Sequence, residues 1–131
     1  MRTLVLDTGG VSALAARGAR LRLAEFRRHG LWPAQVPSVV LAETLTGDHR
    51  RDFAANWLLR ACQIHDVTEL LSREAARLRS ATGRAGTITA TDAIVVAFAS
   101  TCSEPVILTS DPKDLTALAG HAQRPIVISQ P

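Results

Sequence analysis

Four acidic residues stand at positions where a carboxylate can do chemistry. Asp7 follows the apolar run at residues 4–6, and Asp111 follows a similar run at residues 105–109. Glu43 and Asp92 lie in two segments that are otherwise almost free of charge. Carboxylates that gather in one site repel one another and need a cation. Oxygen-only ligands suit Mg²⁺ or Mn²⁺, so a divalent metal site is the chemistry these residues predict.

Each of the three aspartates also has a purely structural interpretation, because Asp is a preferred N-cap of helices. For Asp7 the two interpretations are equally open. For Asp92 capping is a strong alternative, because Thr89, Thr91 and Asp92 all precede or open the same apolar segment. Four separate caps at four such places explain the pattern less well than one shared site does.

Short apolar runs alternate with helical patterns along the chain, which predicts an α/β fold with a mostly parallel sheet. In such a fold the carboxyl ends of the strands share one edge of the sheet, where ligands bind. We expect strands at residues 4–6, 35–37, 64–67, 105–109 and 126–128. We expect helices at residues 10–17, 19–29, 39–46, 49–62, 68–80, 93–100 and 112–119.

The helices expected at residues 39–46 and 93–100 are nearly all apolar or small, which predicts that both are buried. An unpaired buried carboxylate is costly. Glu43 is therefore expected either at the edge of a buried helix or beside a partner such as a metal or an arginine. In the helix after it, Phe53, Trp57 and Leu58 belong to one stripe at helical spacing, typical of core or of a partner surface.

The composition describes one globular domain over residues 1–131, with 47% hydrophobic and 21% charged residues. The formal net charge of +3 permits a polyanionic partner without requiring one. Cys62 and Cys102 lie far apart without CxxC spacing, which argues against zinc and against a disulfide framework. The apolar start is too short for a signal peptide and no run suits a membrane span, so we expect a cytoplasmic protein without membrane attachment.

The segments at residues 5–8, 38–43, 91–97 and 108–111 resemble the four acidic motifs of PIN-domain ribonucleases. The short single-domain form is similar to the VapC toxins of bacterial toxin–antitoxin pairs, and the resemblance covers nearly the whole chain. It implies a three-layer PIN-like fold whose open sheet of about five strands has the order 3-2-1-4-5. The family's catalytic acids fall on Asp7, Glu43, Asp92 and Asp111, and strand order places Asp7 and Asp111 across one crevice. Asp114 is a fifth acid that can share or replace the role of Asp111 as a metal ligand.

The resemblance implies a metal-dependent endoribonuclease that hydrolyses RNA phosphodiester bonds with Mg²⁺ or Mn²⁺. Thr8 and Thr109 are candidates to orient ligands or to contact phosphate. Arg84, in the loop before Asp92, is a further candidate phosphate contact.

The resemblance also implies two protein partners, a small VapB-like antitoxin and a second copy of this chain in a homodimer. The antitoxin is expected in a groove near the early helices. Leu23, Phe26, Trp32 and Trp57 are either part of such surfaces or part of the core.

Three other interpretations fit less well. A haloacid-dehalogenase-type phosphatase needs a second Asp two residues after the first, where this chain has Gly9. A receiver domain needs a lysine after its last strand, and Lys113 is the only lysine, at a helix start. The third is a catalytically silent PIN-like domain that only binds RNA or protein. Retention of all four acids argues against it.

Overall fold

The computed structural model describes residues 1–131, and a five-stranded sheet runs through its centre. The strands are ordered β3-β2-β1-β4-β5, and every neighbouring pair is parallel. Both the predicted α/β class and the strand order 3-2-1-4-5 are therefore confirmed. The strands are β1 (Thr3–Leu6), β2 (Gln35–Pro37), β3 (Gln63–His65), β4 (Pro105–Leu108) and β5 (Val127–Ser129).

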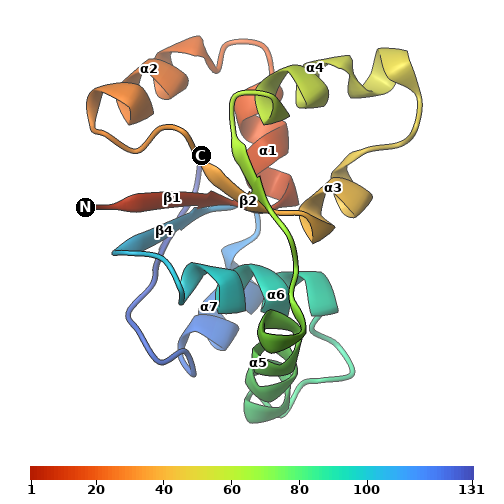
Figure 1. Ribbon diagram of the computed structural model, residues 1–131, viewed down its shortest axis with the longest axis vertical. Helices are drawn as coiled ribbons and strands as arrows, with labels where there is room; N and C mark the ends of the chain where they lie inside the picture. The colour runs from red at the N-terminus through yellow and green to blue at the C-terminus, as the bar shows by residue number, and fades with distance from the viewer.

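Seven helices cover the two faces of this sheet and complete three layers. The helices α1 to α4 lie on one side, and α5 to α7 lie on the other (Figure 1). No helix combines the length and the apolar composition that a membrane crossing requires. The helices are α1 (Thr8–Ala15), α2 (Arg20–Arg28), α3 (Val39–Thr44), α4 (His49–Leu59), α5 (Glu69–Ala81), α6 (Ala90–Ala99) and α7 (Pro112–Ala119).

The two central strands and α6 form the middle of the core. All four residues of β4 and three of the four in β1 are buried. In α6 the buried residues include Val95, Val96 and Phe98, which confirms the prediction that this helix is buried. The rigid core therefore lies directly beneath the carboxyl ends of β1 and β4.

The prediction of a buried helix at residues 39–46 is wrong in both length and burial. Helix α3 ends at Thr44, and Val40 is its only buried residue. The reason is the carboxylate of Asp52, which accepts the backbone N–H of Thr46 at 2.9 Å and that of Gly47 at 2.8 Å. These bonds turn the chain out of the helix, and they also lower the pKa of Asp52, which is itself 5% exposed.

The first turn of α1 packs unusually close to the end of β4. A Cβ atom added at Gly10 would lie 2.4 Å from the backbone oxygen of Leu108, and one added at Gly9 would lie 2.8 Å from the backbone nitrogen of Ser110. Real Cβ atoms do not approach backbone this closely, so both positions require glycine. This close approach brings the start of α1 next to the carboxyl end of β4.

Gly10→Ala is expected to lower the free energy of unfolding by about 2–3 kcal/mol, because the backbone of β4 must move to admit the methyl group. The measurement is urea unfolding followed by circular dichroism. Gly120→Ala is the control, since its Cβ would make an ordinary contact at 3.5 Å to the Ala117 oxygen. Equal stability of the two variants would contradict this account of the β4 contact.

Candidate active site

Asp7 is the most firmly held acid of the site, and it combines both of the roles considered for it. Its Oδ1 atom accepts the Gly10 N–H at 2.7 Å, which caps α1. Its Oδ2 atom accepts the Thr109 hydroxyl at 2.6 Å, which links the ends of β1 and β4. The side chain is 8% exposed, and burial raises its pKa even though these hydrogen bonds act in the opposite direction.

Thr109 lies beside Asp7 because of the strand register. Leu6 pairs with Leu108, so the residues that come directly after these two strands stand next to each other. Thr109 is 1% exposed and also accepts the backbone N–H of Asp111 at 3.1 Å. The residue hydrogen-bonded to Asp7 across the two strand ends is therefore Thr109, and Asp111 follows close behind, with its backbone N–H on the same hydroxyl.

Asp92 is free of the capping role that was its strongest alternative. Helix α6 begins at Ala90, and Thr89 is its N-cap, whose hydroxyl accepts the Asp92 N–H at 3.1 Å. No ion pair holds the Asp92 carboxylate. It lies half-buried in the first turn of a buried helix, with the Thr89 hydroxyl as its hydrogen-bonding neighbour.

The pKa of Asp92 responds to the negative charges of the other acids nearby. It rises from an ordinary value of 3.8 to about 6, mainly because of burial and next because of the negative charge of Asp7. Glu43 and Asp114 raise it further through their charges. The structure thus brings together four acids from different elements: Asp7 after β1, Glu43 in α3, Asp92 in α6 and Asp114 in α7.

Glu43 is exposed and takes part in a small hydroxyl network, which corrects the expectation that it lies in a buried helix. Its Oε2 atom accepts the Thr8 hydroxyl at 3.3 Å, and the Thr8 oxygen accepts the Thr44 hydroxyl at 3.4 Å. Thr8 therefore connects the start of α1 with α3, and it orients Glu43 beside the buried acids.

Asp111 and Asp114 have different environments. Asp111 is exposed, stands at the N-cap position of α7, and its side chain makes no capping bond. Asp114 is half-buried and accepts a hydrogen bond from Arg84 at 2.7 Å. Asp114 is among the acids whose charge raises the pKa of Asp92. Asp114 therefore joins the group as the fifth acid considered from the sequence, while Asp111 connects to Asp7 through the Thr109 hydroxyl.

The donor set suits a hard divalent cation, since it consists of carboxylate and hydroxyl oxygens. The raised pKa of Asp92 reflects first its burial and then the negative charges of Asp7, Glu43 and Asp114, and a bound cation would relieve both. As the side chains stand, no three of the His, Cys, Asp and Glu groups converge on one point. Asp7 is held by its hydrogen bonds, Asp114 by Arg84 and Glu43 by the Thr8 hydroxyl, whereas no ion pair holds Asp92.

Sequence reasoning did not identify three residues that shape this site. Thr44 extends the hydroxyl network, Gly9 admits the close approach of β4, and Arg79 braces the loop that carries Arg84. The double glycine after Asp7 was the one visible signal. Thr44 and Arg79 act through contacts between segments that no local pattern predicts.

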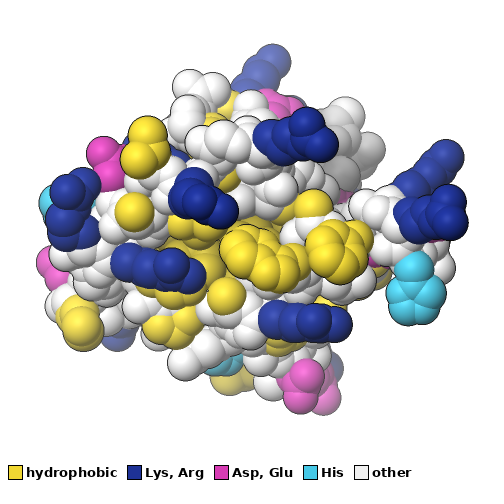
Figure 2. All heavy atoms as spheres, turned by 90° about the horizontal axis from the view of Figure 1, so that it is seen from above, with side chains coloured by type: hydrophobic (Ala, Val, Ile, Leu, Met, Phe, Trp, Pro, Cys, Tyr) yellow, Lys and Arg dark blue, Asp and Glu magenta, His cyan; other side chains and the backbone are white.

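A second feature is the apolar face formed by α2 and α4, seen in Figure 2 as yellow side chains ringed by dark blue ones. Phe53 and Trp57 are 71% and 59% exposed, whereas Leu58 of the same stripe is buried. A hollow of about 310 Å³ lies there, lined by Arg27, Trp32, Trp57, Leu58, Arg60 and Ala61. Of the stripe predicted in this helix, Leu58 thus lies in the core, while Phe53 and Trp57 lie on the surface.

Of the other candidate surface residues, Leu23 and Phe26 belong to the core. Trp32 is partly buried, and the guanidinium of Arg27 lies 5.9 Å from the centre of its ring. The exposed part of this face is therefore centred on α4.

No family model and no curated protein matches this sequence. Solved structures do match its fold. A chain of the DNA-bound VapBC from Salmonella typhimurium is 15% identical with a TM-score of 0.74, covering 99% of this chain and 98% of that one. A chain of VapBC2 from Rickettsia felis, bound to a promoter DNA fragment, is 13% identical with a TM-score of 0.66 and 98% coverage of both. A chain of FitAcB from Neisseria gonorrhoeae is 18% identical with a TM-score of 0.65, covering 95% of this chain and 96% of that one.

These likenesses extend over nearly the whole length of each chain. They confirm the PIN-like fold that the sequence resemblance implied, with its strand order and its layers. The chain thus shares the fold of proteins found in VapBC complexes.

Asp92→Asn is expected to stabilise the metal-free protein at about pH 8, by up to about 3 kcal/mol, and to have little effect near pH 3. The reason is that a carboxyl with a raised pKa penalises the folded state once it must ionise. The gain should therefore fade as the pH falls from about 6 toward 3.8.

The measurement is urea unfolding in EDTA across this pH range. The exposed Asp66 provides the control, and Asp66→Asn should change stability little throughout. A gain from Asp92→Asn that is the same at every pH would contradict the argument.

Proposed function

We propose that this chain is a metal-dependent endoribonuclease that hydrolyses RNA phosphodiester bonds, and that it is the toxin of a VapBC-type toxin–antitoxin module. The proposal is carried by the grouping of Asp7, Glu43, Asp92 and Asp114 at the carboxyl edge of the sheet, with their charges acting on Asp92. The fold shared with chains of VapBC complexes supports the toxin assignment.

In this proposal Asp7, Glu43 and Asp92 are the residues that would hold Mg²⁺ or Mn²⁺, with Asp111 or Asp114 as a further acid. A cation bound there supplies an activated water and stabilises the negative charge that builds on the phosphate. Binding requires the ionised carboxylates, so the raised pKa of Asp92 predicts weaker metal affinity below about pH 6.

The chain's own groups fix this site before any ligand arrives. The N–H of Gly10 and the hydroxyl of Thr109 hold the two oxygens of Asp7. Thr8 orients Glu43 and presents its hydroxyl at the start of α1. Preorganised groups of this kind lower the cost of ordering the site during catalysis.

We further propose that an antitoxin segment binds the apolar face of α2 and α4. The exposed rings of Phe53 and Trp57 match the aromatic anchors of protein interfaces. Arg27 and Arg60 line the hollow beside them, which favours a segment that carries acidic as well as apolar side chains. A homodimer, which rests on the family resemblance, and a cytoplasmic location, which rests on the apolar patterning of the sequence, complete the proposal.

The test of the enzyme assignment is RNA cleavage by the purified protein in Mg²⁺ or Mn²⁺ and in EDTA. We expect cleavage that requires the metal and falls about 100-fold or more in Asp7→Asn, because that variant loses a charged ligand fixed at the site. Glu104→Gln, at the opposite edge of the sheet, should retain activity. Binding of RNA without any cleavage would instead favour the catalytically silent domain.

The test of the partner face is coexpression with the product of the adjacent gene. Trp57→Ala is expected to weaken the complex about 30-fold or more, because an aromatic anchor loses its burial. Leu70→Ala, which removes an even more exposed apolar side chain on α5, should leave the complex intact. Undiminished copurification of Trp57→Ala would exclude this face as the site of binding.

A further inference from the structure

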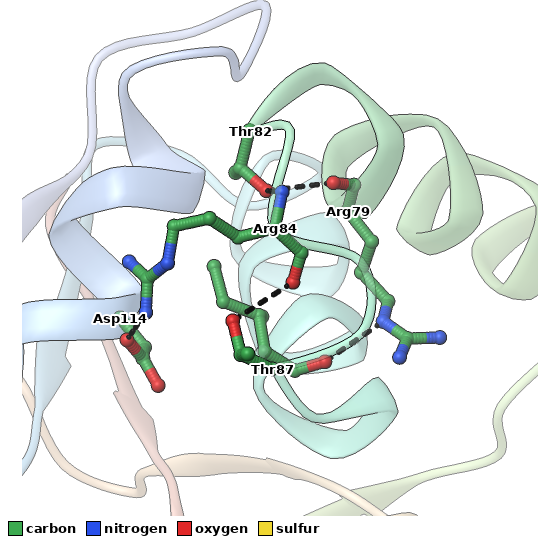
Figure 3. Close-up of polar contacts among 6 residues, drawn as sticks. Arg79, Thr82, Arg84, Thr87 and Asp114 are labelled. Carbon is green, nitrogen blue, oxygen red and sulfur yellow. Dashed lines mark hydrogen bonds and ion pairs between the residues drawn. The ribbon is translucent and has the colours of Figure 1, made fainter.

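The loop at residues 82–88 is braced from a neighbouring helix (Figure 3). Arg79, near the end of α5, donates from Nε to the Ile88 carbonyl at 3.0 Å and from Nη2 to the Ala85 carbonyl at 2.6 Å. One side chain therefore ties two points of the loop to the helix that precedes it. The conformation of this loop is therefore held by side-chain hydrogen bonds from α5.

Inside this loop the backbone of Arg84 is held on both sides. Its N–H donates to the Thr82 hydroxyl oxygen at 3.1 Å. Its carbonyl accepts the Ile88 N–H at 3.0 Å and the Thr87 hydroxyl at 3.2 Å. Ile88 is buried, and the next residue caps α6. The position of Arg84 is thus fixed relative to the helix that carries Asp92.

The side chain of Arg84 points away from this loop and toward α7 (Figure 3). Its Nη2 atom donates to Asp114 Oδ1 at 2.7 Å, and its side chain is 40% exposed. A guanidinium carries five N–H donors, and this is the one side-chain hydrogen bond that Arg84 makes. The remaining donors are free to bind a second anion.

Arg84 is also the only cation paired with an acid of the site. The other ion pairs of the chain join Met1, Arg22, Arg73 and Arg77 to acids outside it. A cluster of carboxylates repels a phosphodiester, so the chain needs a positive group where the substrate enters. Guanidinium suits this task because its planar donors match the oxygens of a phosphate.

We propose that Arg84 binds a phosphate group of the RNA beside the carboxylates, held in place by Asp114 and by the loop that Arg79 braces. This inference rests on the proposed ribonuclease function. It gives Arg84 a role distinct from metal binding. Removing its side chain is therefore expected to weaken RNA binding without weakening metal binding, because the lost positive charge attracts phosphate but repels a cation.

The experiment measures two affinities of the full-length protein. The first is binding of a short fluorescein-labelled single-stranded RNA of mixed sequence, in EDTA, by anisotropy. The second is binding of Mn²⁺ without RNA, by calorimetry. Arg84→Ala is expected to weaken RNA binding about 10-fold or more, since a charge-assisted contact is lost. Its Mn²⁺ affinity should stay equal or rise.

Two further variants complete the experiment. Arg84→Lys keeps the charge and should recover part of the RNA affinity. Arg73→Ala removes an exposed arginine that pairs with Glu69 on α5, and it should bind RNA like the wild type. Unchanged RNA binding by Arg84→Ala overturns the inference. Parallel loss of RNA and Mn²⁺ affinity in a variant whose circular dichroism matches the wild type overturns it too, because that result makes Arg84 a residue that only holds Asp114 and the site in place.

Cleavage of the same RNA by the wild type, in Mn²⁺, separates this inference from the function on which it rests. If the wild type cleaves and Arg84→Ala binds RNA normally, only the role of Arg84 is wrong. If the wild type binds RNA but never cleaves it, the enzyme assignment fails while the phosphate contact stands. If the wild type neither binds nor cleaves this RNA, both are overturned.

Discussion

The hydrogen bond from the Thr109 hydroxyl to Asp7 joins the two central strands at the point where the site begins. It depends on the parallel register of β1 and β4 and on the close approach of α1 to β4 that Gly10 permits. The same carboxylate caps α1, so one buried group connects two strands and a helix. Because this group is anchored in the rigid core, the surrounding acids have a fixed reference against which they are placed.

Uncompensated negative charge is the main physical property of this site. The burial of Asp92 and the charges of its neighbours raise its pKa to about 6, a cost the folded state bears without a bound ligand. Sites that carry such a cost are candidates for function, because the strain is relieved by the ligand they bind. Arg84 offsets only Asp114 and leaves the deeper acids unbalanced.

The three-layer arrangement separates the surfaces available to different partners. The acids lie at the carboxyl edge of the sheet, while the exposed rings of Phe53 and Trp57 lie on the face of α2 and α4. α6 is buried between the sheet and the other outer helices, and its first turn carries Asp92. The apolar face and the acidic edge, for which a protein partner and RNA are proposed, are therefore built from separate elements of one small fold.

The fold class and the residues of interest can be predicted from the order of amino acids alone. Buried runs that alternate with helical patterns require a parallel sheet, and a parallel sheet brings the residues after its strands to one edge. Which acids meet there depends on contacts between distant segments. Local pattern identified Asp111, but only the register of β1 and β4 shows that Thr109 lies beside Asp7, and Asp114 joins the group from the first turn of α7. Helix α3 ends early because Asp52, a residue outside the predicted helix, binds the backbone that follows it. Such contacts join residues that are separated along the chain, so no local periodicity encodes them.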